Sequence, residues 1–142
     1  MNADAPAAQP PHPFRRFELD IRVRYHEVDG QRRVHHGQYL NYFERARVEM
    51  LRAGGVSYRE LENRGLMLVV RSIHVTYHVP AEFDDLLRLS VETLEARRVR
   101  VMHRYELRRD GRLMVEAASE IVCLDAAGRV NRLPPELELP DG

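Results

Sequence analysis

Residues 37–53 read GQYLNYFERARVEMLRA, and this stretch decides the fold. Its large apolar side chains recur every three or four positions, at Tyr39, Tyr42, Phe43, Ala46, Met50 and Leu51. That period is the mark of one apolar face of an α-helix. The spacing predicts a helix about 25 Å long, which Gly54 and Gly55 end. A helix with one apolar face must pack that face against another layer of structure.

Predicted strands lie on both sides of this helix in the sequence. Before it, apolar and polar residues alternate from Phe17 to Tyr25, which is the period of a half-buried strand. After it, Ser57 and Glu60 have capping-box spacing, so a short second helix is expected up to Gly65. The apolar segments that follow predict strands at 66–79, 86–97, 99–109 and 112–124, and residues 129–133 could form a short last strand.

The connections between the later strands are short. Asp110-Gly111 is a typical two-residue hairpin turn, and links of hairpin length join only antiparallel neighbours. We therefore expect an α+β domain in which a curved antiparallel sheet packs around one long helix.

The domain is expected to occupy residues 14–137. Residues 1–13 hold four of the eight prolines and four alanines, so they are expected to form a flexible tail. This tail is not expected to be a signal peptide, because Asp4 stands where a basic region belongs and no apolar block follows. Residues 138–142 are expected to be a loose C-terminus.

Composition excludes several kinds of chemistry. The 142 residues include 22 basic and 22 acidic ones, and every basic residue is an arginine. Without lysine there is no Schiff-base or lysine general-base chemistry. The zero net charge disfavours bulk binding of nucleic acid. Cys123 is the only cysteine, so an intrachain disulfide is impossible and a reducing, cytoplasmic location is expected. No apolar stretch is long enough to span a membrane.

The polar segment from Tyr25 to Leu40 is the best candidate for chemistry, because it connects a rigid strand to a rigid helix. Asp29 lies within it and His36 stands at the predicted helix start. The unpaired N–H groups of a helix start can polarise a carbonyl, and a carboxylate seven residues away could attack the same carbonyl carbon. The alternative is that Asp29 is an ordinary turn residue and His36 is structural. Glu27 and Asp29 could also form a carboxylate pair.

The same segment resembles the signature of the hotdog-fold acyl-CoA thioesterases. Within the 4-hydroxybenzoyl-CoA thioesterase superfamily, it is most similar to the branch associated with the Tol-Pal system. The resemblance extends over residues 22–137. The matching residues are Tyr25, Asp29, Val34, His36, Tyr39-Leu40, Glu44-Arg45-Ala46-Arg47, Tyr77, Pro80-Ala81, Asp84-Asp85, Asp110-Gly111 and Val122-Cys123.

This resemblance implies a hotdog fold and hydrolysis of an acyl-CoA, or of an acyl-carrier-protein thioester. Asp29 then matches the catalytic carboxylate, either as nucleophile or as general base. His36 matches the helix-start residue whose N–H polarises the thioester carbonyl. No metal or redox cofactor is implied. The resemblance also implies a homodimer or homotetramer in which two sheets pair edge to edge and the site faces the partner.

The sequence departs from the family signature close to Asp29. Glu27-Val28 replaces Asp-Thr, and Arg32 stands where a glycine is usual. If that glycine requires a positive φ, Arg32 perturbs the site. Arg32 and Arg33 could instead bind a CoA phosphate, or both could simply be solvated.

Three further residues are candidates for substrate binding: Tyr39, Glu44 and Arg71. Glu44 could equally pair with Arg47 three residues later, and Arg71 could be a solvated strand residue. The alternative function is a non-hydrolytic module that binds acyl-CoA, which Arg32 favours. Nucleic-acid binding through the arginines is a third hypothesis, but the sequence lacks the net charge for it.

Overall fold

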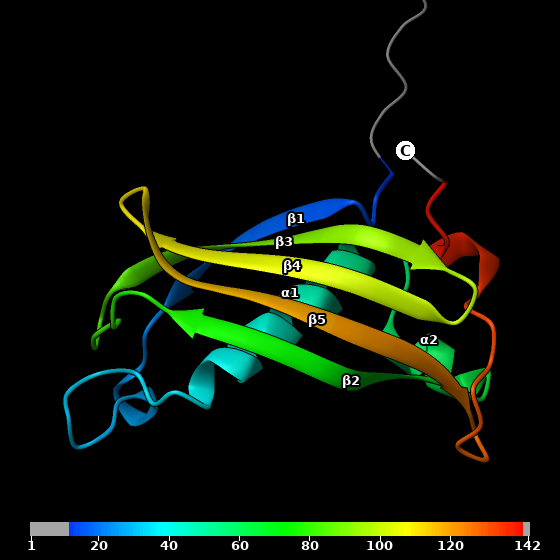
Figure 1. Ribbon diagram of the computed structural model, residues 1–142, viewed down its shortest axis with the longest axis horizontal. Coiled ribbons are helices and arrows are strands. Elements are labelled where there is room, and N and C mark those ends of the chain that lie inside the picture. The colour runs from blue at the N-terminus through cyan, green and yellow to red at the C-terminus, as the bar shows by residue number, and fades with distance from the viewer. Residues whose placement is uncertain (1–11, 141–142) are drawn as a thin grey trace, which may run out of the picture.

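The computed structural model describes residues 12–140. Five strands form one antiparallel sheet in the spatial order β1-β3-β4-β5-β2 (Figure 1). The strands are β1 (Arg16–Arg22), β2 (Leu66–Tyr77), β3 (Leu86–Arg97), β4 (Arg100–Arg109) and β5 (Arg112–Asp125). Two edges therefore exist, one formed by β1 and the other by β2.

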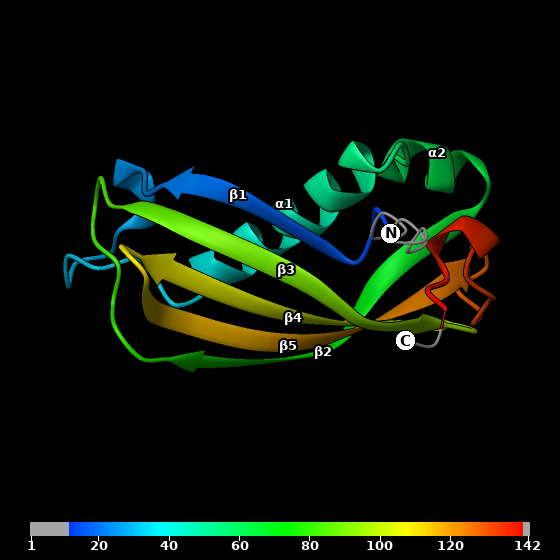
Figure 2. The ribbon, with the colours of Figure 1, turned by 90° about the horizontal axis from the view of Figure 1, so that it is seen from above.

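Helix α1 (Gln38–Ala53) lies along one face of the curved sheet (Figure 2). Every residue assigned to its apolar face is buried, and Gly54 follows its last turn as expected. The helix packs on the inward side chains of the sheet, which alternate along β3 and β4 as the pleat of a strand requires. This arrangement is the hotdog fold that the sequence resemblance implied.

Local signals predicted the short helix and the hairpin correctly. The Ser57 hydroxyl accepts a hydrogen bond from the Glu60 N–H at 3.1 Å, and helix α2 (Tyr58–Asn63) follows it. Asp110 and Gly111 have φ values of 50° and 82°, which is the left-handed pair that a type I′ hairpin needs.

Two predicted strand assignments were wrong. Tyr25 does not continue β1; it begins a 3-10 turn (Tyr25–Glu27) and is 81% exposed. Residues 129–133 form no strand and make only one isolated bridge, between Leu124 and Val130. The Asp125 carboxylate explains this second error, because it accepts two backbone N–H groups and turns the chain. The Leu133 N–H then donates to the Arg98 carbonyl, in the turn between β3 and β4.

The N-terminal boundary of the domain agrees with the expectation, whereas the C-terminal boundary differs from it. Phe14 is buried against Leu51, Leu61 and Leu137, so the packed domain includes the residue at which it was expected to begin. Residues 138–142 were expected to be loose, yet Leu139 is buried and its N–H donates to the Ala96 carbonyl at 2.8 Å. Most of the expected N-terminal tail, and residues 141–142, lie outside the described residues.

Within residues 12–140, no helix is both long enough and apolar enough to cross a membrane.

Replacing Phe43 by alanine should lower the free energy of unfolding by about 3–5 kcal/mol. Phe43 is fully buried, and its ring lies 4.7 Å from that of Tyr105, so truncation leaves a cavity between α1 and the sheet. Urea unfolding measures the change. The matched control is Phe83→Ala, because Phe83 is 51% exposed. Equal losses in the two variants would contradict this account of the core.

Candidate active site

The chain between β1 and α1 is held at its base by backbone hydrogen bonds. The Val34 N–H donates to the Ala81 carbonyl at 2.9 Å, and the His35 N–H donates to the Glu27 carbonyl at 3.0 Å. Val28 and Val34 also form an isolated antiparallel bridge. Residues 29–33 are therefore the tip of a narrow loop whose base is fixed.

Glu27 joins this loop to α1 through a buried carboxylate. Its Oε1 accepts from the Tyr42 hydroxyl at 2.8 Å, and its Oε2 accepts from the Gln38 amide at 3.0 Å. Burial and the hydrogen bond to Glu27 raise the pKa of Tyr42 far above its ordinary value, so the phenol stays a donor. Glu27 thus faces the helix, and it does not pair with Asp29 as the sequence allowed.

Asp29 lines a surface hollow with a volume of about 550 Å³. Its Oδ1 accepts the Gln31 N–H at 2.8 Å, which is the geometry of an Asx turn. This is the hydrogen bond that the interpretation of Asp29 as a turn residue expects. The turn also orients its carboxylate, and no hydrogen bond among the described residues uses Oδ2. The hollow is completed by Tyr25, Val28, Arg32, Glu82 and Phe83.

Arg32 adopts the left-handed conformation at the tip of this loop. Its φ is 63°, and its N–H closes the turn by donating to the Asp29 carbonyl at 3.0 Å. A side chain with a Cβ is strained in this region, whereas glycine is not. The position therefore does require a positive φ, and this chain meets that requirement with an arginine that also lines the hollow.

The start of α1 is organised by two neighbouring histidines. The Gly37 N–H donates to Nδ1 of His35 at 3.0 Å, and the His35 and His36 rings stack with centroids 4.2 Å apart. The His36 carbonyl accepts from the Tyr77 hydroxyl at 2.8 Å. Within residues 12–140 the His36 N–H has no hydrogen-bond acceptor. It is thus an available donor at the positive end of the helix.

Four of the other predicted substrate contacts lie away from the Asp29 hollow. Tyr39 is buried, its hydroxyl accepts from the Ala81 N–H at 3.3 Å, and burial raises its pKa. Arg71 pairs with Glu120 on β5 at 3.1 Å. The exposed side chains of Glu44 and Arg33 are not among the residues that line the hollow.

The suggested pair between Glu44 and Arg47 does not form. Arg47 is buried, and its Nη1 donates to the Tyr105 hydroxyl at 3.0 Å. The helical spacing brings residues three apart to one side of a helix. However, Arg47 points toward the sheet, and Glu44 is exposed.

Sequence reasoning missed the positioning roles of Glu27 and His35. The partners of Glu27 lie 11 and 15 residues away, and no short spacing motif encodes such contacts. His35 could have been recognised as a capping acceptor, because its ring lies two residues before the N–H that it accepts.

Residues 12–140 also contain Cys123 and side chains of the types that can bind a metal ion. Burial raises the pKa of the Cys123 thiol, so this residue is a small buried side chain and not a reactive thiolate. In the described part of the chain, no cluster of three or more His, Cys, Asp or Glu residues could hold a metal ion.

Sequence comparison relates this chain to known enzymes. A model of the thioesterase-like superfamily matches residues 23–139. Acyl-CoA thioesterase YbgC of Haemophilus influenzae is 33% identical over 110 residues, which cover 77% of this chain and 81% of that protein. Acyl-CoA thioester hydrolase YbgC of Escherichia coli O157:H7 is also 33% identical, covering 77% of this chain and 82% of that protein.

Solved structures share the fold. A "probable thioesterase" from Bartonella henselae has a TM-score of 0.80 at 28% identity, covering 84% of this chain and 99% of that one. A DHNA-CoA thioesterase from Staphylococcus aureus has a TM-score of 0.80 at 25% identity, covering 83% of this chain and 80% of that one.

Replacing Arg32 by glycine should raise the free energy of unfolding by up to about 1 kcal/mol, because glycine adopts φ 63° without strain. Urea unfolding measures the change. Arg33→Gly is the matched control, since Arg33 is not among the residues with positive φ and glycine there should destabilise the fold. Destabilisation of both variants to the same extent would show that Arg32 is not strained.

Proposed function

The chain belongs to the thioesterase-like superfamily, and on that premise we propose that it hydrolyses acyl-CoA thioesters to the free acid and CoA. Two observations carry this proposal: the turn that orients the Asp29 carboxylate, and the available N–H of His36 at the start of α1. The acyl-CoA class of substrate is supported by the two curated relatives named above, each covered over most of its length.

The start of α1 polarises the thioester carbonyl group. A thioester carbonyl oxygen bound at the His36 N–H receives a hydrogen bond and lies at the positive end of the helix dipole. Both effects strengthen as the oxygen becomes negative during attack, so they stabilise the transition state more than the substrate. The stacked His35 ring and the Tyr77 hydroxyl hold this peptide segment in place.

Asp29 brings about the attack on the carbonyl carbon by one of two routes. As a nucleophile, a carboxylate oxygen bonds to the carbonyl carbon, the C–S bond breaks and CoA leaves as a thiolate; water then hydrolyses the mixed anhydride. As a general base, Asp29 removes a proton from water while the water oxygen attacks and the same C–S bond breaks. Either route suits a thiolate leaving group, which needs little acid assistance.

Arg32 is the residue that we expect to contact the CoA moiety. Arg32 lines the same hollow as Asp29, and arginine binds phosphate with a planar pair of N–H donors. The strained backbone at Arg32 is consistent with a functional reason to keep this side chain. Arg33 remains a weaker candidate, because its side chain does not line the hollow.

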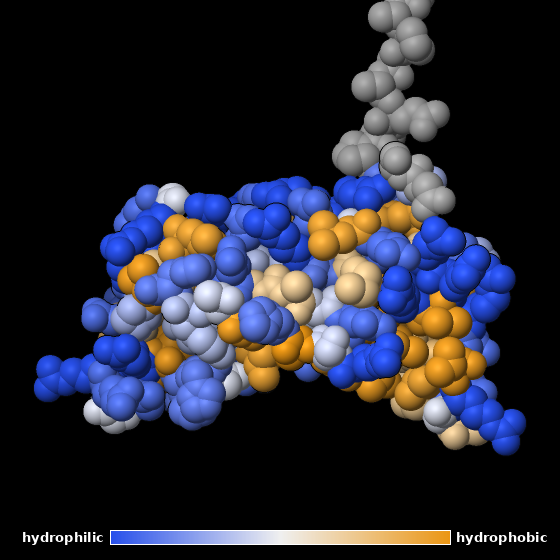
Figure 3. Space-filling model, in the orientation of Figure 1, coloured by the Kyte–Doolittle hydropathy of each residue, from blue (hydrophilic) through white to orange (hydrophobic). Residues whose placement is uncertain are grey.

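The working enzyme is proposed to be a homodimer that pairs through β2, or a tetramer of such dimers. Strand β2 is a twelve-residue edge, and it exposes Met67, Val69, Val70 and Tyr77 by 40–47% each. Figure 3 shows separate apolar patches among polar side chains at the middle and right of the lower margin, where Figure 1 draws β2. A long apolar edge favours pairing with another strand. Because Tyr77 bonds to His36, a partner on this edge would lie beside the active site.

Asp29→Asn should reduce kcat for acyl-CoA hydrolysis by at least 10²-fold while the protein stays folded. Asparagine keeps an oxygen that can accept the Gln31 N–H, so the loop is preserved and only the charge is lost. A thiol-release assay over a panel of acyl-CoA chain lengths gives the readout. The control is Asp110→Asn, in the hairpin turn, which should retain full activity.

Undiminished turnover by Asp29→Asn would contradict the role of Asp29. Binding of acyl-CoA without thiol release by the unmodified protein would contradict hydrolysis itself and favour the non-hydrolytic alternative.

Val69→Lys should weaken the dimer by at least about tenfold in Kd, since a charge on an edge strand opposes pairing with another strand. Sedimentation equilibrium measures the association, and thiol release measures activity on the same samples. Val130→Lys is the control, because Val130 is apolar and exposed but lies outside β2. An active monomer in the unmodified protein would refute the shared site.

A further inference from the structure

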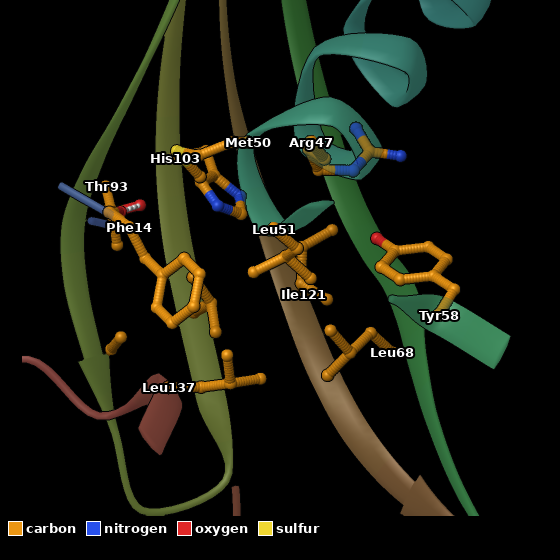
Figure 4. Close-up of a pocket in the computed structure, with 12 residues that line it drawn as sticks. Phe14, Arg47, Met50, Leu51, Tyr58, Leu68, Thr93, His103, Ile121 and Leu137 are labelled. Atoms are coloured by element: carbon orange, nitrogen blue, oxygen red, sulfur yellow. Dashed lines mark hydrogen bonds between the residues drawn. The ribbon is translucent and has the colours of Figure 1, made fainter. Parts of the chain in front are cut away.

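A second cavity lies beneath the C-terminal half of α1. It has a volume of about 30 Å³ and is bounded by Met50 and Leu51 of α1, Leu68 of β2 and Ile121 of β5 (Figure 4). None of the residues that line the Asp29 hollow lines this cavity. Its walls are therefore independent of the proposed active site.

One wall of this apolar cavity carries a buried cation. Arg47 is 7% exposed, and an arginine remains charged at any physiological pH. Its Nη1 donates to the Tyr105 hydroxyl, and Tyr58 points its hydroxyl toward it from α2 (Figure 4). In the described part of the chain, however, the groups that act on the Arg47 charge are the tyrosines Tyr105 and Tyr58 and no carboxylate, and its Nε has no hydrogen-bond partner. A buried charge without a counter-charge is costly.

His103 lines the same cavity from β4 and is 6% exposed. Burial, with a smaller contribution from the Arg47 charge, lowers its pKa to about 3. The imidazole is then neutral at pH 7 and keeps one N–H. Its Nδ1 is the second buried polar atom with no partner among the described residues. Figure 4 shows Arg47 and His103 at the same end of the cavity.

The neighbouring hydroxyls of Tyr105 and Ser119 already have hydrogen-bond partners. The Tyr105 hydroxyl accepts from Arg47 and shares a 2.7 Å hydrogen bond with the Ser119 hydroxyl. The cavity thus combines a net positive charge with two buried nitrogens that can each present an N–H and have nothing to bond. This is the chemistry of an anion site.

The volume of the cavity limits the size of the anion that can bind in it. About 10–15 Å³ is needed to hold one water molecule, so 30 Å³ accommodates a monatomic ion but not an acyl chain or a phosphate. We propose that the cavity between α1 and the sheet binds one chloride-sized monovalent anion, held by Nε of Arg47 and Nδ1 of His103.

Thermal unfolding at constant ionic strength tests this proposal, with sodium chloride exchanged for sodium gluconate. Because the anion binds only the folded state, the folded-to-unfolded ratio should rise about tenfold when free chloride reaches ten times its Kd. Bromide should act like chloride, whereas gluconate is too large to enter. Equal Tm values in chloride and gluconate would overturn the proposal and leave water in the cavity.

Two variants locate the effect. Arg47→Met removes the buried charge at similar volume and should abolish the chloride dependence of Tm. Arg45→Met is the matched control, because Arg45 is exposed on the same helix and its loss should leave the dependence intact. If both variants keep the full dependence, the anion binds elsewhere and the proposal fails.

A direct measurement covers the case in which Arg47→Met does not fold. Crystals of the unmodified protein soaked in bromide should give an anomalous peak within hydrogen-bonding distance of both Arg47 Nε and His103 Nδ1. A cavity without such a peak at saturating bromide overturns the proposal. Loss of thioesterase activity plays no part in either readout, so failure here is separate from failure of the proposed function.

Discussion

The contact between Phe43 and Tyr105 is the interaction on which the rest of the structure depends. Phe43 projects from the middle of α1 and Tyr105 from β4, with ring centroids 4.7 Å apart and neither ring exposed. Aromatic rings bury more apolar surface than any other side chains. Because this contact fixes the helix near its midpoint, both of its halves are placed against the sheet at once.

Each half of α1 takes part in its own set of buried hydrogen bonds. Tyr42, beside Phe43, carries the hydrogen bond to Glu27 that ties the Asp29 loop to the helix start. On the other side, the Tyr105 hydroxyl accepts from Arg47 and contacts Ser119. Core residues of α1 and β4 therefore also support the proposed active site and the proposed anion cavity. An arginine at position 47 cannot lose its charge, which is why burial of that side chain calls for a counter-ion.

Much of the fold could be predicted because its signals are local. The apolar period of residues 37–53, the cap at Ser57 and the turn at Asp110-Gly111 each act within a few residues. The errors involve residues whose partners are distant in the sequence: Leu139 reaches Ala96, Leu133 reaches Arg98, and Arg47 reaches Tyr105. The Asp125 carboxylate accepts two backbone N–H groups and so turns the chain before residues 129–133. The β-propensity of those residues contains no information about this turn.

The sequence by itself determined that one amphipathic helix must pack on an antiparallel sheet, and it identified Asp29 and His36 as the residues at the junction. The resemblance to the family signature also singled out Arg32, which stands where a glycine is usual. Only the tertiary structure decided that Arg32 takes a positive φ, that Glu27 faces the helix and that Arg47 and His103 line one cavity. The physical reason is that spacing encodes which side of an element a residue occupies, whereas its neighbours come from elements that meet only when the chain folds.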